Sequence, residues 1–114
     1  MAIERIERGP RMSQAVKGGG IVALAGQISE KGVSVADQAA DILARIDALL
    51  AAAGSNKSKI LSATIWLTDM ADYDEFNRVW DKWIDPANPP ARACIQARLV
   101  RPQWKVEIQV LALA

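Results

Sequence analysis

The stretch VADQAADILARIDALLAAA, residues 35–53, predicts an amphipathic helix and decides the fold. Its apolar side chains recur at spacings of three and four residues, which places on one stripe Ala39, Ile42, Leu43, Ile46, Leu49, Leu50 and Ala53. Ser34, followed three residues later by Asp37, is typical of a helix N-terminus. Gly54 stands where a left-handed residue often ends a helix. We therefore expect one long helix that covers a sheet.

The segments around this helix predict strands and a second helix. Five segments have the length and apolar pattern of strands: 3–8, 21–26, 60–68, 91–99 and 104–112. Residues 9–20 are rich in glycine and predict a loop. In residues 60–68, we expect one side to carry Leu61, Ala63, Ile65 and Leu67. The second helix starts near Asp72 and ends before Pro86.

The resulting order is β-β-α-β-α-β-β, an α+β fold with two helices packed on one face of a sheet. Two helices can cover only one of its faces. The other face is partly apolar, in residues 21–26 and at Trp66, and an exposed face of that kind favours association. We therefore expect a homo-oligomer whose sheets pack together, with polar groups in clefts between the copies.

Composition limits the possible functions. The chain has 114 residues, which predicts a single domain over residues 1–114. A net charge of +1 argues against general nucleic-acid binding. The chain has no histidine, which excludes histidine-based triads and the usual imidazole metal sites. One cysteine precludes an intramolecular disulfide and fits a reducing compartment such as the cytoplasm.

The chain also carries no sign of a membrane or export segment. No apolar run approaches the roughly 18 residues of a membrane span. The segment from Met1 to Arg5 interleaves acid and base and has no apolar core, so we expect no secretory signal there. We therefore expect no membrane partner.

Two charges inside otherwise apolar strands, Arg92 and Glu107, are the strongest candidates for chemistry. A half-buried guanidinium needs an anionic partner and can bind a carboxylate through two parallel hydrogen bonds. A glutamate in a partly dry cleft has its pKa raised by desolvation and lowered by a nearby arginine, which suits a group that activates water. The alternative is that the two simply pair across a solvated face. A hairpin register would decide whether they share a face.

Other candidates have plainer explanations. Cys94 follows Arg92 by two residues, on the same face of the predicted strand, and could be an activated thiol. Without a histidine to act as base, a packing role is favoured. Asn77 could donate into a cleft or face solvent. Trp80 and Trp83 are more typical of packing than of a stacking platform. The acidic side chains near residues 69–75 follow a helix start, so we expect no metal site.

Several short motifs, in order along nearly the whole chain, resemble those of the Rid family of reactive-intermediate deaminases, the YjgF-type proteins. They are Met12-Ser13-Gln14-Ala15-Val16, Ala25-Gly26-Gln27-Ile28, Leu67-Thr68-Asp69-Met70, Pro90-Ala91-Arg92-Ala93-Cys94 and Val106-Glu107-Ile108. The segment Gly54-Ser55-Asn56-Lys57-Ser58 and the strand around Trp66 resemble the YoaB-like branch most.

The resemblance implies a chorismate-mutase-like fold with a mixed sheet. It also implies a homotrimer whose sheets form a central barrel, with clefts between subunits. The implied activity is hydrolysis of enamine and imine intermediates, such as 2-aminoacrylate-type 2-imino acids, to a 2-keto acid and ammonia. This metabolite damage control needs no cofactor and no metal.

The resemblance also implies roles for individual residues. Arg92 would grip the substrate carboxylate, and Glu107 would position or activate water. Three positions would line the cleft: Gly26, Asn77 and Cys94. Met12 would be the fourth, but it stands where deaminase-active members carry a tyrosine, and methionine cannot donate a hydrogen bond.

Two other functions stay open at this point. Met12 favours a non-catalytic trimeric module that binds small carboxylates such as 2-keto acids. A ribonuclease that inhibits translation is a weaker alternative, because the chain is nearly neutral and lacks histidine.

Overall fold

Helix α1 spans Val35–Ala52 and confirms the amphipathic helix predicted from the sequence. Ser34 caps it by accepting a hydrogen bond of 3.0 Å from the backbone N–H of Asp37. Gly54 follows the helix with φ +79°, in the left-handed region that glycine adopts without strain. Every residue of the predicted apolar stripe is buried. The helix therefore forms where the local signals place it.

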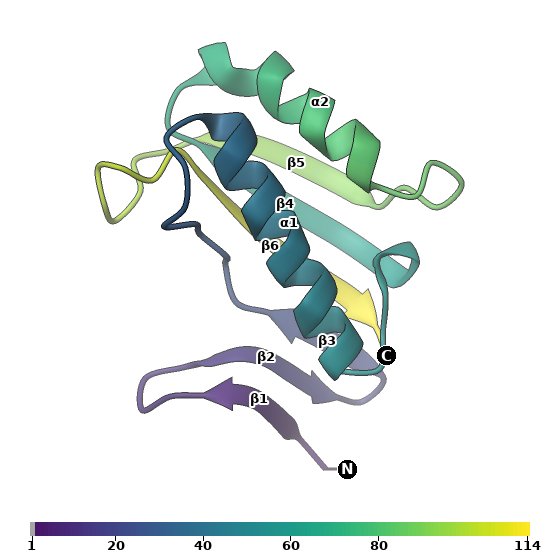
Figure 1. Cartoon of the computed structure of the whole chain (residues 1–114). Helices are drawn as coiled ribbons and strands as arrows, with labels where there is room; N and C mark the ends of the chain where they lie inside the picture. The colour runs from purple at the N-terminus through teal and green to yellow at the C-terminus, as the bar shows by residue number, and fades with distance from the viewer. Residues whose placement is uncertain (1) are drawn as a thin grey trace.

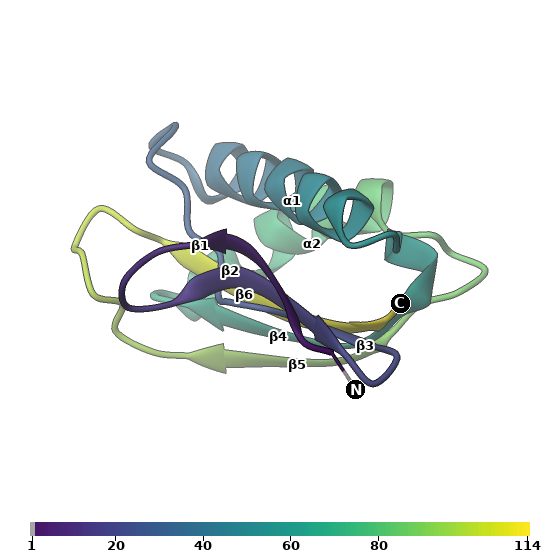
Figure 2. The ribbon, with the colours of Figure 1, turned by 90° about the horizontal axis from the view of Figure 1, so that it is seen from below.

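The computed structural model describes residues 2–114, so Met1 of the N-terminal segment discussed above lies outside the described residues. Helices α1 and α2 (Tyr73–Trp83) lie side by side on one face of a six-stranded sheet (Figures 1 and 2). The strands are β1 (Glu4–Arg8), β2 (Ser13–Gly18), β3 (Ile21–Leu24), β4 (Ile60–Leu67), β5 (Ala91–Gln96) and β6 (Val106–Leu113). Short 3-10 turns span Lys57–Lys59 and Met70–Asp72. Neither helix combines the length and apolar character needed to cross a membrane within the described residues.

The sheet is mixed, as expected, with strand order β1-β2-β3-β6-β4-β5. Strands β4 and β5 are parallel, and every other neighbouring pair is antiparallel. Strand β4 therefore separates β5 from β6, although these two strands follow each other in the chain. The hairpin between residues 91–99 and 104–112 that the sequence analysis considered does not form.

The predicted loop over residues 9–20 is wrong, because it contains strand β2. This strand pairs with β1 on one side and β3 on the other. Only Ala15 in it is fully buried, so it has no apolar run to mark it. Glycines lie near both ends of this six-residue strand, and Gly19 and Gly20 form the turn to β3. These glycines made the whole segment look like a loop.

A β-bulge changes the predicted faces of β4. The pairing of β4 with β6 shifts register between Ile60 and Ser62. As a result Ile60 enters the core, whereas Leu61, which we expected beside Ala63, is 43% exposed. From Ala63 onward the predicted alternation is correct.

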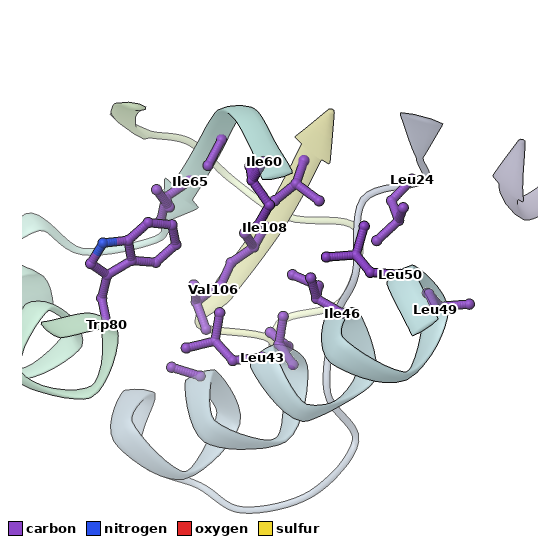
Figure 3. Packing of buried hydrophobic residues seen from close by; sticks show 14 of the residues in the cluster. Leu24, Leu43, Ile46, Leu49, Leu50, Ile60, Ile65, Trp80, Val106 and Ile108 are labelled. Carbon is purple, nitrogen blue, oxygen red and sulfur yellow. The ribbon is translucent and has the colours of Figure 1, made fainter. Parts of the chain in front are cut away.

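The core lies between the two helices and one face of the sheet, as Figure 3 shows for residues such as Ile46, Ile65 and Ile108. Figure 2 shows the opposite face of the sheet without any covering element. We call this the open face. The side chains that it exposes include Ile95, Leu111 and Leu113, each between 39% and 47% accessible.

Replacing Ile65 with alanine should lower the free energy of unfolding by about 2–5 kcal/mol, because the closed core cannot fill the cavity. Val33→Ala is the matched control, since Val33 is 82% exposed and should change stability by less than about 0.5 kcal/mol. Urea unfolding at one fixed protein concentration measures both. Equal midpoints for the two variants would contradict this placement of Ile65.

Candidate functional site

Arg92 lies on β5 and faces the helix side of the sheet. It pairs in register with Ala63 of β4, which is buried in the core, so both side chains lie on the same face. Cys94 follows two residues later on this face, as the alternation predicted. Because β5 is the edge strand, this face of it is only half covered, and Arg92 and Cys94 are half-buried.

Helix α2 holds the guanidinium of Arg92. Nη1 donates a hydrogen bond of 2.9 Å to Oδ1 of Asn77, and Nη2 donates one of 3.1 Å to Oη of Tyr73. The Cζ atom lies 5.3 Å from the centroid of the Trp80 ring. The rings of Tyr73 and Phe76 are 5.8 Å and 6.0 Å away. Contacts of a cation with aromatic rings at this range are attractive, so the guanidinium has a fixed position.

No carboxylate of residues 2–114 pairs with Arg92. Within the described chain the single ion pair joins Lys31 and Asp41 at 4.0 Å. Both hydrogen-bond partners of Arg92 are neutral oxygens. A guanidinium has five N–H donors and binds carboxylates more strongly than neutral groups. The site therefore offers a positioned cation with donors left for an external anion.

A hollow of ≈ 370 Å³ opens beside the guanidinium, lined by Met70, Tyr73, Arg92 and Cys94. Its size suits a small organic acid. A larger hollow of ≈ 510 Å³ lies past the end of β5, around Arg98, Arg101 and Trp104. It contains none of the predicted site residues, so volume alone does not locate the site.

Burial raises the pKa of the Cys94 thiol, and this effect outweighs the opposing influence of Arg92. The thiol is therefore protonated at neutral pH, which makes it a poor nucleophile. The structure supports the packing interpretation of Cys94 over the activated thiol.

Glu107 lies on β6 and points to the open face. It pairs in register with Trp66, which in turn pairs with Ile95. Burial raises the pKa of the Glu107 carboxyl above its usual value. Within residues 2–114 desolvation is the single cause of this shift, and the arginine that we expected to oppose it makes no contribution from the same chain.

Gly26 lies directly against the Glu107 carboxylate. A Cβ atom built on Gly26 would overlap Oε2 of Glu107, so any side chain at position 26 would displace the carboxylate. Backbone hydrogen bonds between Gln27 and Ile108, of 2.8 Å and 3.1 Å, hold the two segments together. Here glycine is required by close approach and not by its backbone angles.

The predicted site residues thus form two separate groups in one chain. Arg92, Cys94 and Asn77 lie together on the helix side, and Gly26 and Glu107 lie together at the open face. The sequence analysis left open whether Arg92 and Glu107 pair across one face, and they do not. Strand β4 lies between their strands, and the alternation along each strand places them on opposite faces.

Met12 does not lie with Arg92. It precedes β2, is 46% exposed, and its carbonyl oxygen accepts a hydrogen bond of 2.8 Å from the backbone N–H of Gly9. Strands β2 and β5 lie near opposite edges of the sheet (Figure 1). In one chain, Met12 cannot reach the guanidinium of Arg92.

Tyr73 is a site residue that the sequence analysis missed. It precedes Asn77 by four residues and Trp80 by seven, which places all three on one side of α2. This spacing could have indicated it, but nothing in the sequence placed that side of the helix against Arg92. The described residues contain no cluster of three or more side chains that could hold a metal ion.

Comparisons with known proteins find relatives along nearly the whole chain. The family model described as Endoribonuclease L-PSP matches residues 3–114. The RutC family protein YoaB of Escherichia coli is 39% identical over 112 residues, which cover 98% of either chain. Reactive Intermediate Deaminase A, chloroplastic, of Arabidopsis thaliana is 35% identical over 107 residues, which cover 88% of this chain and 57% of the plant protein. A crystal structure of a YjgF family member from Neisseria meningitidis superimposes with TM-score 0.97 and 48% identity, covering 99% of this chain and 95% of that one.

The raised pKa of Glu107 predicts a pH-dependent penalty on stability. The folded chain holds this proton more tightly than the unfolded chain, so Glu107 lowers stability as the pH rises from the usual range of glutamate through the raised value. Glu107→Gln should therefore gain stability relative to the parent at about pH 7 and gain little at about pH 3.5. Urea unfolding at both pH values measures the difference. Glu4→Gln, on the exposed strand β1, controls for the loss of one charge. A gain that is equal at both pH values would show that Glu107 is not desolvated.

Proposed function

We propose that this chain, which belongs to the Endoribonuclease L-PSP family of Rid and YjgF-type proteins, is a hydrolytic deaminase of 2-imino acids in the cytoplasm. The family includes a protein named as a reactive intermediate deaminase. The products would be a 2-keto acid and ammonia, and the reaction would need no cofactor. One observation carries the proposal: the guanidinium of Arg92 is positioned beside a hollow and has no carboxylate partner in residues 2–114.

The pocket around Arg92 supports the substrate class. A 2-imino acid carries a carboxylate next to the reactive carbon, so binding of the carboxylate by Arg92 would place that carbon at the hollow. The apolar wall of Met70 would leave room for a short aliphatic side chain. Small 2-imino and 2-keto acids share these features and are the proposed ligands.

A complete site requires a second copy of the chain. Arg92 and Glu107 lie on opposite faces of one sheet, so the Glu107 that serves a given Arg92 must come from a neighbouring copy. The apolar open face, with Leu111 and Leu113, supplies a surface for such packing. Pairing of two different surfaces forms a ring when the rotation between copies closes, and a ring of three would be a homotrimer with three equal clefts around a central barrel.

The proposed reaction needs only these groups. The imine carbon is electrophilic, and Glu107 would hold a water against it and accept a proton as the water adds. Glu107 would then return this proton to the nitrogen of the tetrahedral adduct. The C–N bond would break as the adduct oxygen forms the C=O bond of the keto acid, so that ammonia leaves and the hydroxyl proton passes to Glu107 or to solvent. A carboxyl whose pKa is raised by desolvation suits this exchange of one proton better than an ordinary glutamate.

The non-catalytic alternative shares Arg92 but has no use for Glu107. The exposed Met12, which donates no hydrogen bond, is the observation that favours it. In that case the purified protein would bind keto acids and release none from imines. RNA cleavage remains the weaker alternative, and incubation with RNA is a simple control.

Arg92→Ala should lower kcat/KM for imine hydrolysis about a hundredfold or more, because the substrate loses its charged anchor. An assay coupled to a serine or threonine dehydratase, which generates the imine in place, reads this as slower release of keto acid. Arg101→Ala is the matched control, since Arg101 belongs to the other hollow and should leave the rate unchanged. Unchanged hydrolysis in Arg92→Ala would remove the proposed function.

Mixing the inactive variants Arg92→Ala and Glu107→Gln during refolding should restore activity. In any mixed ring of three, one interface combines the intact Arg92 of one variant with the intact Glu107 of the other. About one third of the sites in mixed rings therefore recover, which is about one quarter of all sites in an equal mixture. Sedimentation confirms that the mixture contains trimers. Mixed trimers without activity would contradict a site shared between copies.

A further inference from the structure

We propose that Tyr73 is a second carboxylate-binding residue, which donates its phenol O–H to the anion that Arg92 holds. This inference rests on the proposed function, because it concerns the ligand of the same pocket. It assigns part of the substrate affinity to a residue of α2, outside the strands that carry Arg92 and Glu107.

The direction of the hydrogen bond between the two residues leaves the phenol proton free. Arginine has donors only, so in the contact of 3.1 Å the guanidinium donates from Nη2 and Tyr73 Oη accepts. Among the hydrogen bonds of residues 2–114, the Tyr73 hydroxyl accepts this one and donates none. The phenol therefore keeps one unused donor immediately beside the cation.

Tyr73 also stands where a ligand would meet it. The residue is 38% exposed and lines the same hollow as Arg92, together with Met70 and Cys94. Asn77, the other partner of the guanidinium, is half-buried and does not line this hollow. Asn77 thus holds the guanidinium without lining the hollow, whereas Tyr73 both holds it and lines the hollow.

The cation strengthens the donor. A hydroxyl that accepts a hydrogen bond from a charged group is polarised and becomes a better donor in turn. A carboxylate has two oxygens, so one can bind the guanidinium while the other accepts from the phenol. This arrangement favours a carboxylate over an ester or amide of similar size.

The phenol near Arg92 comes from Tyr73 and not from position 12. Met12 offers no hydrogen-bond donor and lies far along the sheet from Arg92. Tyr73 is the single tyrosine of the chain. Helix α2 therefore places the single phenol of the chain beside the guanidinium of Arg92.

Tyr73→Phe tests the inference, because phenylalanine keeps the ring against the guanidinium and removes only the hydroxyl. The dissociation constant of pyruvate, measured by calorimetry, should rise about tenfold or more, the value of one hydrogen bond to a charged group. KM for the imine should rise with kcat nearly unchanged, because the carboxylate is bound equally in the ground and transition states. The thermal midpoint should not change.

The two proposals fail in different ways. Loss of pyruvate binding in Arg92→Ala together with unchanged binding in Tyr73→Phe would overturn the role of Tyr73 and leave the proposed function intact. Unchanged binding in Arg92→Ala would overturn both. In an Arg92→Ala background, Tyr73→Phe should add little, because the two residues act on one carboxylate.

A labelled protein separates donation from mere positioning of Arg92. Because Tyr73 is the only tyrosine, growth on a difluorinated tyrosine labels this position alone with a phenol that loses its proton near neutral pH. Affinity for pyruvate should fall as that proton is lost, since a phenolate cannot donate. The unlabelled protein should show no such fall over the same range. Affinity that is independent of pH in the labelled protein would contradict donation by Tyr73.

Discussion

The candidate site depends on a guanidinium that is held without being neutralised. Two neutral oxygens, from Asn77 and Tyr73, accept hydrogen bonds from Arg92, and the ring of Trp80 lies 5.3 Å from its Cζ atom. A carboxylate in place of either oxygen would have formed an internal ion pair and removed the demand for an external anion. Aromatic rings instead orient the cation while leaving its charge uncompensated.

Helix α2 contributes side chains both to the hydrophobic core and to the candidate binding site. Phe76 and Trp80 are buried in the core, and the same rings form the surface on which the guanidinium lies. Trp83 joins α2 to α1 through a hydrogen bond of 2.9 Å from Nε1 to Asp47. The hydrophobic contacts that seat the helix on the sheet therefore also set the position of the binding groups. Arg92 itself needs only to lie on an edge strand beneath it.

The candidate site residues lie in two groups on opposite faces of the sheet. The covered face carries the cation, and the open face carries Glu107, whose pKa is raised by desolvation, with Gly26 against it. One chain cannot bring these groups together, because a strand exposes alternate residues on opposite sides. The same one-sided covering that separates them leaves apolar side chains exposed at Ile95, Leu111 and Leu113. The proposed association of copies would cover these side chains and would bring the two groups of site residues together.

Local patterns in the sequence determined α1 with its cap and the alternation that places Arg92 with Cys94, because each depends on neighbours within a few residues. The motifs around Arg92 and Glu107 likewise identified the family. Long-range pairing decided the rest. Strand β2 is held by its partners on both sides and not by an apolar run, and a bulge exchanged Ile60 for Leu61 in the core. Insertion of β4 between β5 and β6 separated Arg92 from Glu107, and the register of the two pairings set them on opposite faces. Packing of α2 brought Tyr73 to the guanidinium. Such placements depend on contacts between segments far apart in the chain, and the local spacing of residues carries no information about those contacts.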